Sequence, residues 1–117
     1  MDFDEAIAAH SAWKAKLKAY LQKPDKSLDA KRVGLDDQCK LGQWLHGEAT
    51  KFSAIAEFRE LKSQHANFHQ AAADLIKRAD AGEKVAEQAA LGANSPFSKL
   101  SSQVVQSILK VQQKITV

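Results

Sequence analysis

Apolar residues recur every three or four positions along most of the chain, which is the spacing of a helix with one buried face. The first stripe predicts a helix over Phe3–Leu21, which should end before Pro24 because proline disfavours helical geometry in the preceding residue. The longest stripe predicts a helix over Ser53–Ala81, with Gly82 just past its end. A weaker turn or helix is expected over Glu83–Leu91.

A last helix is expected to begin at Pro96 with Ser95 as its N-cap, since proline is favoured at the first helical position and serine at the cap. Two shorter elements precede the long central helix. One is expected over Ser27–Val33, with its first serine as the cap. The other should begin near residues 36–37 and end at Gly47.

The composition agrees with a helical protein. Only five glycines and two prolines interrupt the chain, and no tract alternates apolar and polar residues for long. Alanine, leucine, lysine, glutamine and glutamate, which are good helix formers, dominate. We therefore predict an all-α fold, a four-helix bundle with an additional short helix, in which residues 1–117 form a single domain.

The charge and the cysteine content narrow the class of protein. The net charge of +3 comes from 17 basic and 14 acidic residues spread along the chain, so neither a nucleic acid nor a membrane surface is expected as a partner. No apolar stretch approaches the roughly 20 residues that span a bilayer, and the acidic N-terminus does not resemble a secretory signal. A single cysteine, Cys39, excludes an internal disulfide. A reducing, cytoplasmic location is expected.

Polar residues with metal-binding side chains stand on the predicted inward faces. One histidine at such a position is more often a hydrogen-bonded core residue than a ligand. Here three of the four histidines and the only cysteine share this property, and burying such groups unpaired would cost on the order of 1–3 kcal/mol each. A shared metal would remove that cost for all of them. The candidate ligands are His10, Cys39, His65 and His69.

The chemistry of this set favours zinc. His65 and His69 are four residues apart, so their side chains can meet on one face of a helix. Three imidazoles and one thiolate suit the tetrahedral nitrogen and sulfur coordination of Zn²⁺. Cys39, expected in the first turn of its helix, would have its thiolate stabilised there. The His65–His69 pair has no core carboxylate beside it, which weighs against a di-iron centre of the hemerythrin kind.

Residues near the candidate ligands have less specific roles. Asp36 and Asp37 could cap a helix, the more common use of aspartate, or hydrogen-bond a ligand histidine. Gly42 could allow a neighbouring helix to approach or could be a tolerated weak point. His46, at the end of a helix, is expected to face solvent and is left out of the site. Trp13, Trp44 and Phe68 are expected to pack in the core around the site.

Three fragments resemble the chemoreceptor zinc-binding domain of bacteria, the CZB family. They are HSAWK at residues 10–14, CKLGQWL at residues 39–45 followed by Gly47, and HANFH at residues 65–69. Their order and separation match the family pattern, and the resemblance extends over essentially the whole chain. It implies a four-helix bundle that binds one Zn²⁺ per chain through three histidines and one cysteine, here His10, Cys39, His65 and His69.

The resemblance also implies a role in signalling. Such domains are usually fused to cytoplasmic chemoreceptors or diguanylate cyclases, sense zinc or oxidants such as hypochlorous acid through the zinc-bound cysteine, and are commonly dimeric. This chain carries no output module. We expect either a free-standing domain that acts on a partner in trans or a domain from a longer protein that acts in cis. A homodimer is expected.

Three other functions are alternatives to a zinc sensor. A metal-free helical interaction module would bury its histidines by hydrogen bonds, and a hemerythrin-like carrier would bind iron and oxygen. An enzyme with Cys39 as nucleophile ranks last, because no residues of a substrate cleft accompany it.

Overall fold

The computed structural model describes residues 2–25, 27–37, 39–82, 91–92 and 95–115. Within these residues the chain forms helices and no strand, so the all-α prediction is confirmed. The elements, in chain order, are α1 (Phe3–Gln22), α2 (Ala30–Val33), α3 (Lys40–His46), the 3-10 helix η1 (Glu48–Phe52), α4 (Ala56–Asp80) and α6 (Pro96–Ile115).

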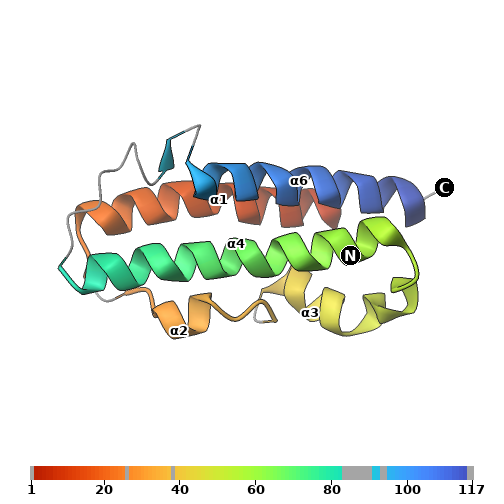
Figure 1. Ribbon diagram of the computed structural model, residues 1–117, viewed down its shortest axis with the longest axis horizontal. Helices are drawn as coiled ribbons and strands as arrows, with labels where there is room; N and C mark the ends of the chain where they lie inside the picture. The colour runs from red at the N-terminus through yellow and green to blue at the C-terminus, as the bar shows by residue number, and fades with distance from the viewer. Residues whose placement is uncertain (1, 26, 38, 83–90, 93–94, 116–117) are drawn as a thin grey trace.

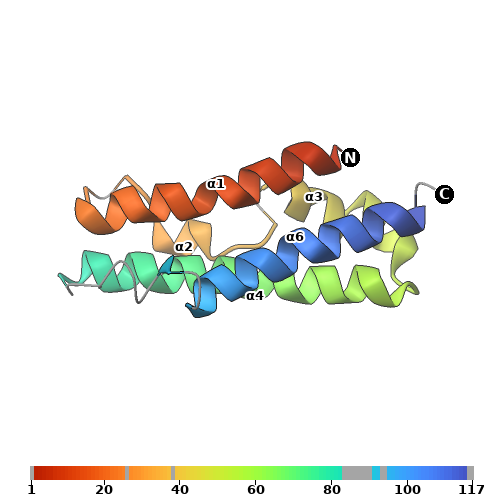
Figure 2. The same ribbon diagram turned by 90° about the horizontal axis from the view of Figure 1, so that it is seen from above.

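The three long helices α1, α4 and α6 run along the long axis of a bundle that measures 47 × 25 × 20 Å (Figure 1). Each of the three packs against the other two. The short helices α2 and α3 follow one another along the side of α4 that is opposite to α6, and together they complete the fourth side of the bundle (Figure 1). Seen from above, α6 crosses α4 obliquely and does not cross α1 (Figure 2).

Two of the three long helices, α1 and α6, begin where the sequence indicated. The Asp2 carboxylate caps α1 by accepting a hydrogen bond from the Glu5 N–H at 3.0 Å. The Ser95 hydroxyl caps α6 by accepting one from the Ser98 N–H at 3.2 Å. After α4, Gly82 has a φ of 83°, in the left-handed region that ends many helices. Local capping chemistry therefore sets these boundaries.

The core lies along the apolar stripes of the long helices. On α4 the buried positions recur every three or four residues and include His65 and His69. Ile55, which precedes the helix, is half-buried. The fully or almost fully buried apolar residues of α4 and α6 are Phe58, Leu61, Phe68, Ala72, Ala73, Leu75, Ile76, Ala79, Phe97, Val104, Ile108 and Val111.

The segment before α2 differs from the prediction. α2 begins at Ala30, and its cap is Asp29, whose carboxylate accepts a hydrogen bond from the Lys31 N–H at 3.0 Å. Ser27 is not the cap. Its own N–H donates to the Asp25 carboxylate at 3.0 Å, which forms a local turn in place of a helical start.

The start of α3 is also later than predicted. The helix begins at Lys40, and the residues at 36–37 lie in the preceding loop. Cys39 is the N-cap, since its sulfur accepts a hydrogen bond from the Gly42 N–H at 3.3 Å. Similarly, α4 begins at Ala56 and not at Ser53, because Ser53 is the C-cap of η1 and Ile55 has an extended backbone as the N-cap of α4.

The weak helix predicted over Glu83–Leu91 lies outside the described residues, apart from Leu91, which is buried. In the described part of the chain, no helix combines the length and the apolar character needed to cross a membrane.

Candidate metal centre

Four side chains with metal-binding atoms converge from three elements. His10 lies near the middle of α1, Cys39 caps α3, and His65 and His69 lie one turn apart on α4. Each offers one ligand atom, and these atoms all lie within 4.8 Å of one another. All four residues selected from the inward stripes are therefore brought to one point, where they are positioned to hold one metal ion.

The shortest distances within the cluster are those among Cys39 and the two histidines of α4. His65 Nε2 lies 3.2 Å from Cys39 Sγ and 3.0 Å from His69 Nε2. Cys39 Sγ lies 3.6 Å from His69 Nε2. The His10 ring packs beside both, with centroids 5.0 Å from that of His65 and 5.9 Å from that of His69. The three rings and the sulfur face a common centre.

Backbone carbonyls orient two of the rings. His10 Nδ1 donates to the Ala6 carbonyl, and His69 Nδ1 donates to the Val33 carbonyl, each at 2.8 Å. A neutral imidazole carries only one N–H, so these bonds leave a lone pair on each Nε2. Metal-binding histidines use their second nitrogen in this way. Neither carbonyl was predicted, because a backbone acceptor leaves no mark in the sequence.

Two buried ring nitrogens have no hydrogen-bond partner in the described part of the chain, His10 Nε2 and His65 Nδ1. Such groups are rare in folded proteins and cost about 1–3 kcal/mol each when nothing compensates them. The lone pair on His10 Nε2 would be satisfied by a cation at the centre of the cluster. The donor set thus fits a metal ion on structural grounds.

Burial sets the protonation of the cluster. It lowers the pKa of His10 and of His69, and burial together with the neighbouring His69 lowers the pKa of His65 to about 2. Burial raises the pKa of the Cys39 thiol, and the opposing effect of the Gly42 N–H is smaller. The rings are therefore neutral at pH 7 and able to bind a metal, whereas the thiol must release its proton to do so. The start of α3 stabilises the thiolate through the Gly42 N–H, as predicted, but burial has the larger effect on the pKa of Cys39.

Of the three aromatic residues expected to pack in the core around the site, only Phe68 is buried against the cluster. Phe68 is fully buried, and its ring centroid lies 5.4 Å from that of His10 and 5.2 Å from that of Phe97. Trp13 and Trp44 are only half-buried, at the edge of the core. These three residues supply packing, not ligands.

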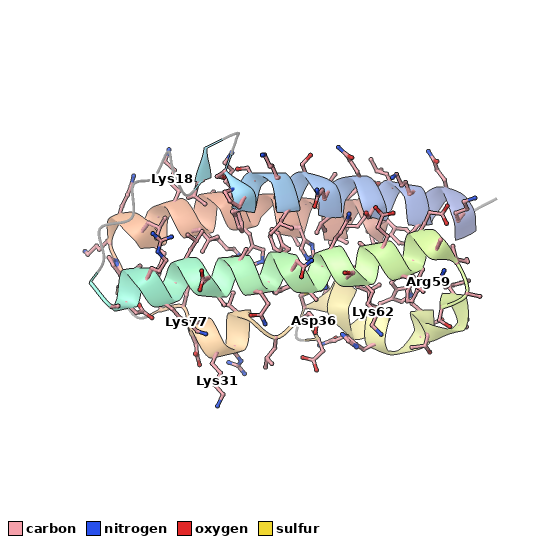
Figure 3. The ribbon with its side chains drawn as sticks, in the orientation of Figure 1. Lys18, Lys31, Asp36, Arg59, Lys62 and Lys77 are labelled. Atoms are coloured by element: carbon pink, nitrogen blue, oxygen red, sulfur yellow. The ribbon has the colours of Figure 1, made fainter. Side chains whose placement is uncertain are left out.

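The acidic loop before Cys39 does not cap α3. Asp36 lies in the connection between α2 and α3, beside α4 (Figure 3), and its Oδ2 lies 3.2 Å from His46 Nε2. His46 is the last residue of α3 and is exposed, as predicted. The predicted capping by Asp36 is therefore wrong, because Cys39 occupies the cap. The carboxylate pairs with the histidine outside the cluster.

Comparison with known families agrees with this geometry. A family model described as chemoreceptor zinc-binding domain matches residues 10–76, a span that includes all four cluster residues and covers more than half of the chain. No curated protein and no solved structure gives a significant match. The matched family is sensory and binds zinc, and it is not a catalytic family. The chain belongs to the chemoreceptor zinc-binding domain family.

Proposed function

We propose that the protein is a zinc-dependent sensory domain of bacterial signal transduction, in which one Zn²⁺ per chain is bound by His10, Cys39, His65 and His69. The observation that carries the proposal is the convergence of three buried imidazoles and one thiol, with His10 Nε2 lacking any other partner in the described residues. The membership of a zinc-binding signalling family supports it.

The position of the ligands indicates how a signal could be generated. When bound, zinc would stabilise the Cys39 thiolate and hold three elements at one point. His69 is hydrogen-bonded to the end of α2, and Cys39 begins α3. Loss of either ligand would therefore loosen the α2–α3 side of the bundle from α4. We infer that this change in helix packing is what the domain transmits.

Two inputs could produce that change. Zinc could bind and dissociate as its free concentration changes. Alternatively, an oxidant such as hypochlorous acid could convert Cys39 to a sulfenic acid, the first and reversible product of thiol oxidation, and weaken its bond to the metal. Cys39 is half-buried and lines a cavity, and this position supports the second input.

The output is also part of the proposal. Domains of this family occur in chemoreceptors and related signalling proteins. We propose a cytoplasmic domain that forms a homodimer and regulates a chemoreceptor or a diguanylate cyclase, in cis or in trans.

The other bundle functions explain the cluster less well. A metal-free interaction module would leave His10 Nε2 buried without a partner. A hemerythrin-like iron centre needs bridging carboxylates, and the cluster found among the described residues contains none.

Elemental analysis of protein purified without added metal tests the assignment. We expect about one zinc per chain in the wild type and in His46→Ala, which removes the histidine outside the cluster. His65→Ala and Cys39→Ser should lose most of the zinc. Full zinc content in both of these variants would refute the proposed ligand set, and iron in the wild type would favour the hemerythrin-like alternative.

A further inference from the structure

A cavity of about 250 Å³ adjoins the metal cluster between the beginning of α1 and the beginning of α3. His10 and Cys39 contribute to its lining. The three histidines of the cluster are almost fully buried, at 2%, 0% and 3% exposure for His10, His65 and His69, whereas Cys39 is only half-buried. Of the two cluster residues that line the cavity, Cys39 is the more exposed, which favours it as the one that a molecule in this cavity reaches.

The walls of the cavity are largely apolar. Ala6 and Ala9 line it from α1, and Leu41 lines it from α3. Ala9 is exposed, so its methyl group borders both the cavity and the solvent. Since the walls offer little to replace the hydration of a charge, they favour small uncharged molecules.

Charged side chains also line the cavity. Glu5 and Lys40 line it and form an ion pair, with Oε1 and Nζ 3.3 Å apart and both side chains well exposed. Asp2 lines it as well. Two carboxylates against one ammonium group leave a negative balance, which should repel anions at low ionic strength.

We propose that this access cavity is the route by which small, uncharged thiol-reactive molecules reach Cys39, with Ala9 limiting its width and Glu5 disfavouring anions. The idea deepens the proposed function, because modification of Cys39 would remove one zinc ligand. A haloacetamide is a suitable probe. The Cys39 sulfur supplies the electron pair of the new S–C bond, iodide leaves with the electrons of the C–I bond, and the thiol proton passes to solvent.

The width of the cavity is tested with Ala9→Leu, in which a larger side chain should narrow it. Ala12→Leu, on an exposed position of α1 outside the lining, is the matched control. The chain has a single cysteine, so mass spectrometry follows alkylation at one site. In chelator-treated protein we expect iodoacetamide to react about tenfold more slowly in Ala9→Leu and within about twofold of wild type in Ala12→Leu. Equal rates in the two variants would overturn the proposal.

The charge preference gives a second test that does not depend on the folding of Ala9→Leu. Glu5→Gln removes one carboxylate and frees the Lys40 ammonium group. We expect the ratio of the iodoacetate rate to the iodoacetamide rate to rise by about threefold or more at low salt and to return toward wild type at high salt. An unchanged ratio at low salt would overturn the role of Glu5.

Zinc content is measured on the same preparations, so the two proposals fail in different ways. If the wild type holds no zinc but Ala9→Leu slows alkylation, the zinc assignment is refuted and the access cavity is supported. If the wild type holds zinc but Ala9→Leu reacts as fast as Ala12→Leu, the access cavity is refuted and the zinc assignment is supported.

Discussion

A Cβ atom on Gly42 would lie 1.8 Å from the backbone carbonyl oxygen of Asp36. No side chain can occupy that position while the loop keeps its path. The loop before Cys39 therefore crosses directly over α3 because residue 42 is glycine. This crossing, and not the approach of a neighbouring helix, is what the glycine permits, and it delivers Cys39 to the start of α3 facing His65 and His69.

Gly42→Ala should disrupt both the fold and the site. Because the clash is with backbone, the loop would have to move, and we expect the free energy of unfolding to fall by about 3 kcal/mol or more with loss of zinc. Urea denaturation and elemental analysis measure the two effects. Gly34→Ala is a graded control, since its Cβ would lie 3.2 Å from the Ala73 Cβ and should cost only about 1 kcal/mol. A Gly42→Ala protein with normal stability and zinc would contradict the loop path.

Asp36→Asn should have little effect. Its partner is His46 at 3.2 Å, and the two side chains are 26% and 38% exposed, so water screens the pair. We expect a loss of less than about 1 kcal/mol in urea denaturation and an unchanged zinc content. Loss of zinc in this variant would instead give the Asp36 carboxylate a direct role at the cluster.

Acid should destabilise the metal-free protein. The pKa values of His10, His65 and His69 are lowered in the fold from 6.5, so below that pH the unfolded chain binds protons that the folded chain does not. Stability is then fully present above pH 6.5 and declines as the pH falls toward the folded pKa values, which for His65 is about 2. Each histidine contributes at most about 1.4 kcal/mol per pH unit.

Urea denaturation with a chelator at pH 7.5, 6.5 and 5.5 measures this decline. Stability that stays constant or rises between pH 6.5 and 5.5 would contradict the burial of neutral imidazoles.

Removal of zinc should lower the thermal stability. A ligand that binds only the folded state at a thousandfold excess over its dissociation constant stabilises it by about 4 kcal/mol, which for a domain of this size corresponds to roughly 10 °C or more in Tm. Thermal melts with and without chelator should differ for the wild type and coincide for Cys39→Ser. A wild-type melt that the chelator leaves unchanged would support a metal-free interaction module.

Much of the candidate site could be predicted because helical periodicity is local. His10, His65 and His69 stand on inward stripes whose spacing is visible in the sequence, and the structure buries all three. The caps Asp2 and Ser95 are equally local, since a side chain bonds to an N–H three residues ahead.

The sequence by itself determined the helical class, the long helices and the four residues that meet. Tertiary structure decided the path of the loop over Gly42, the orientation of His69 by the Val33 carbonyl, and the cavity beside Cys39. The physical reason is that side-chain periodicity is set by neighbours along one helix. The route of a loop and the spaces between elements depend on contacts between distant segments. Every residue has a backbone carbonyl, so the sequence does not show which one will orient a histidine.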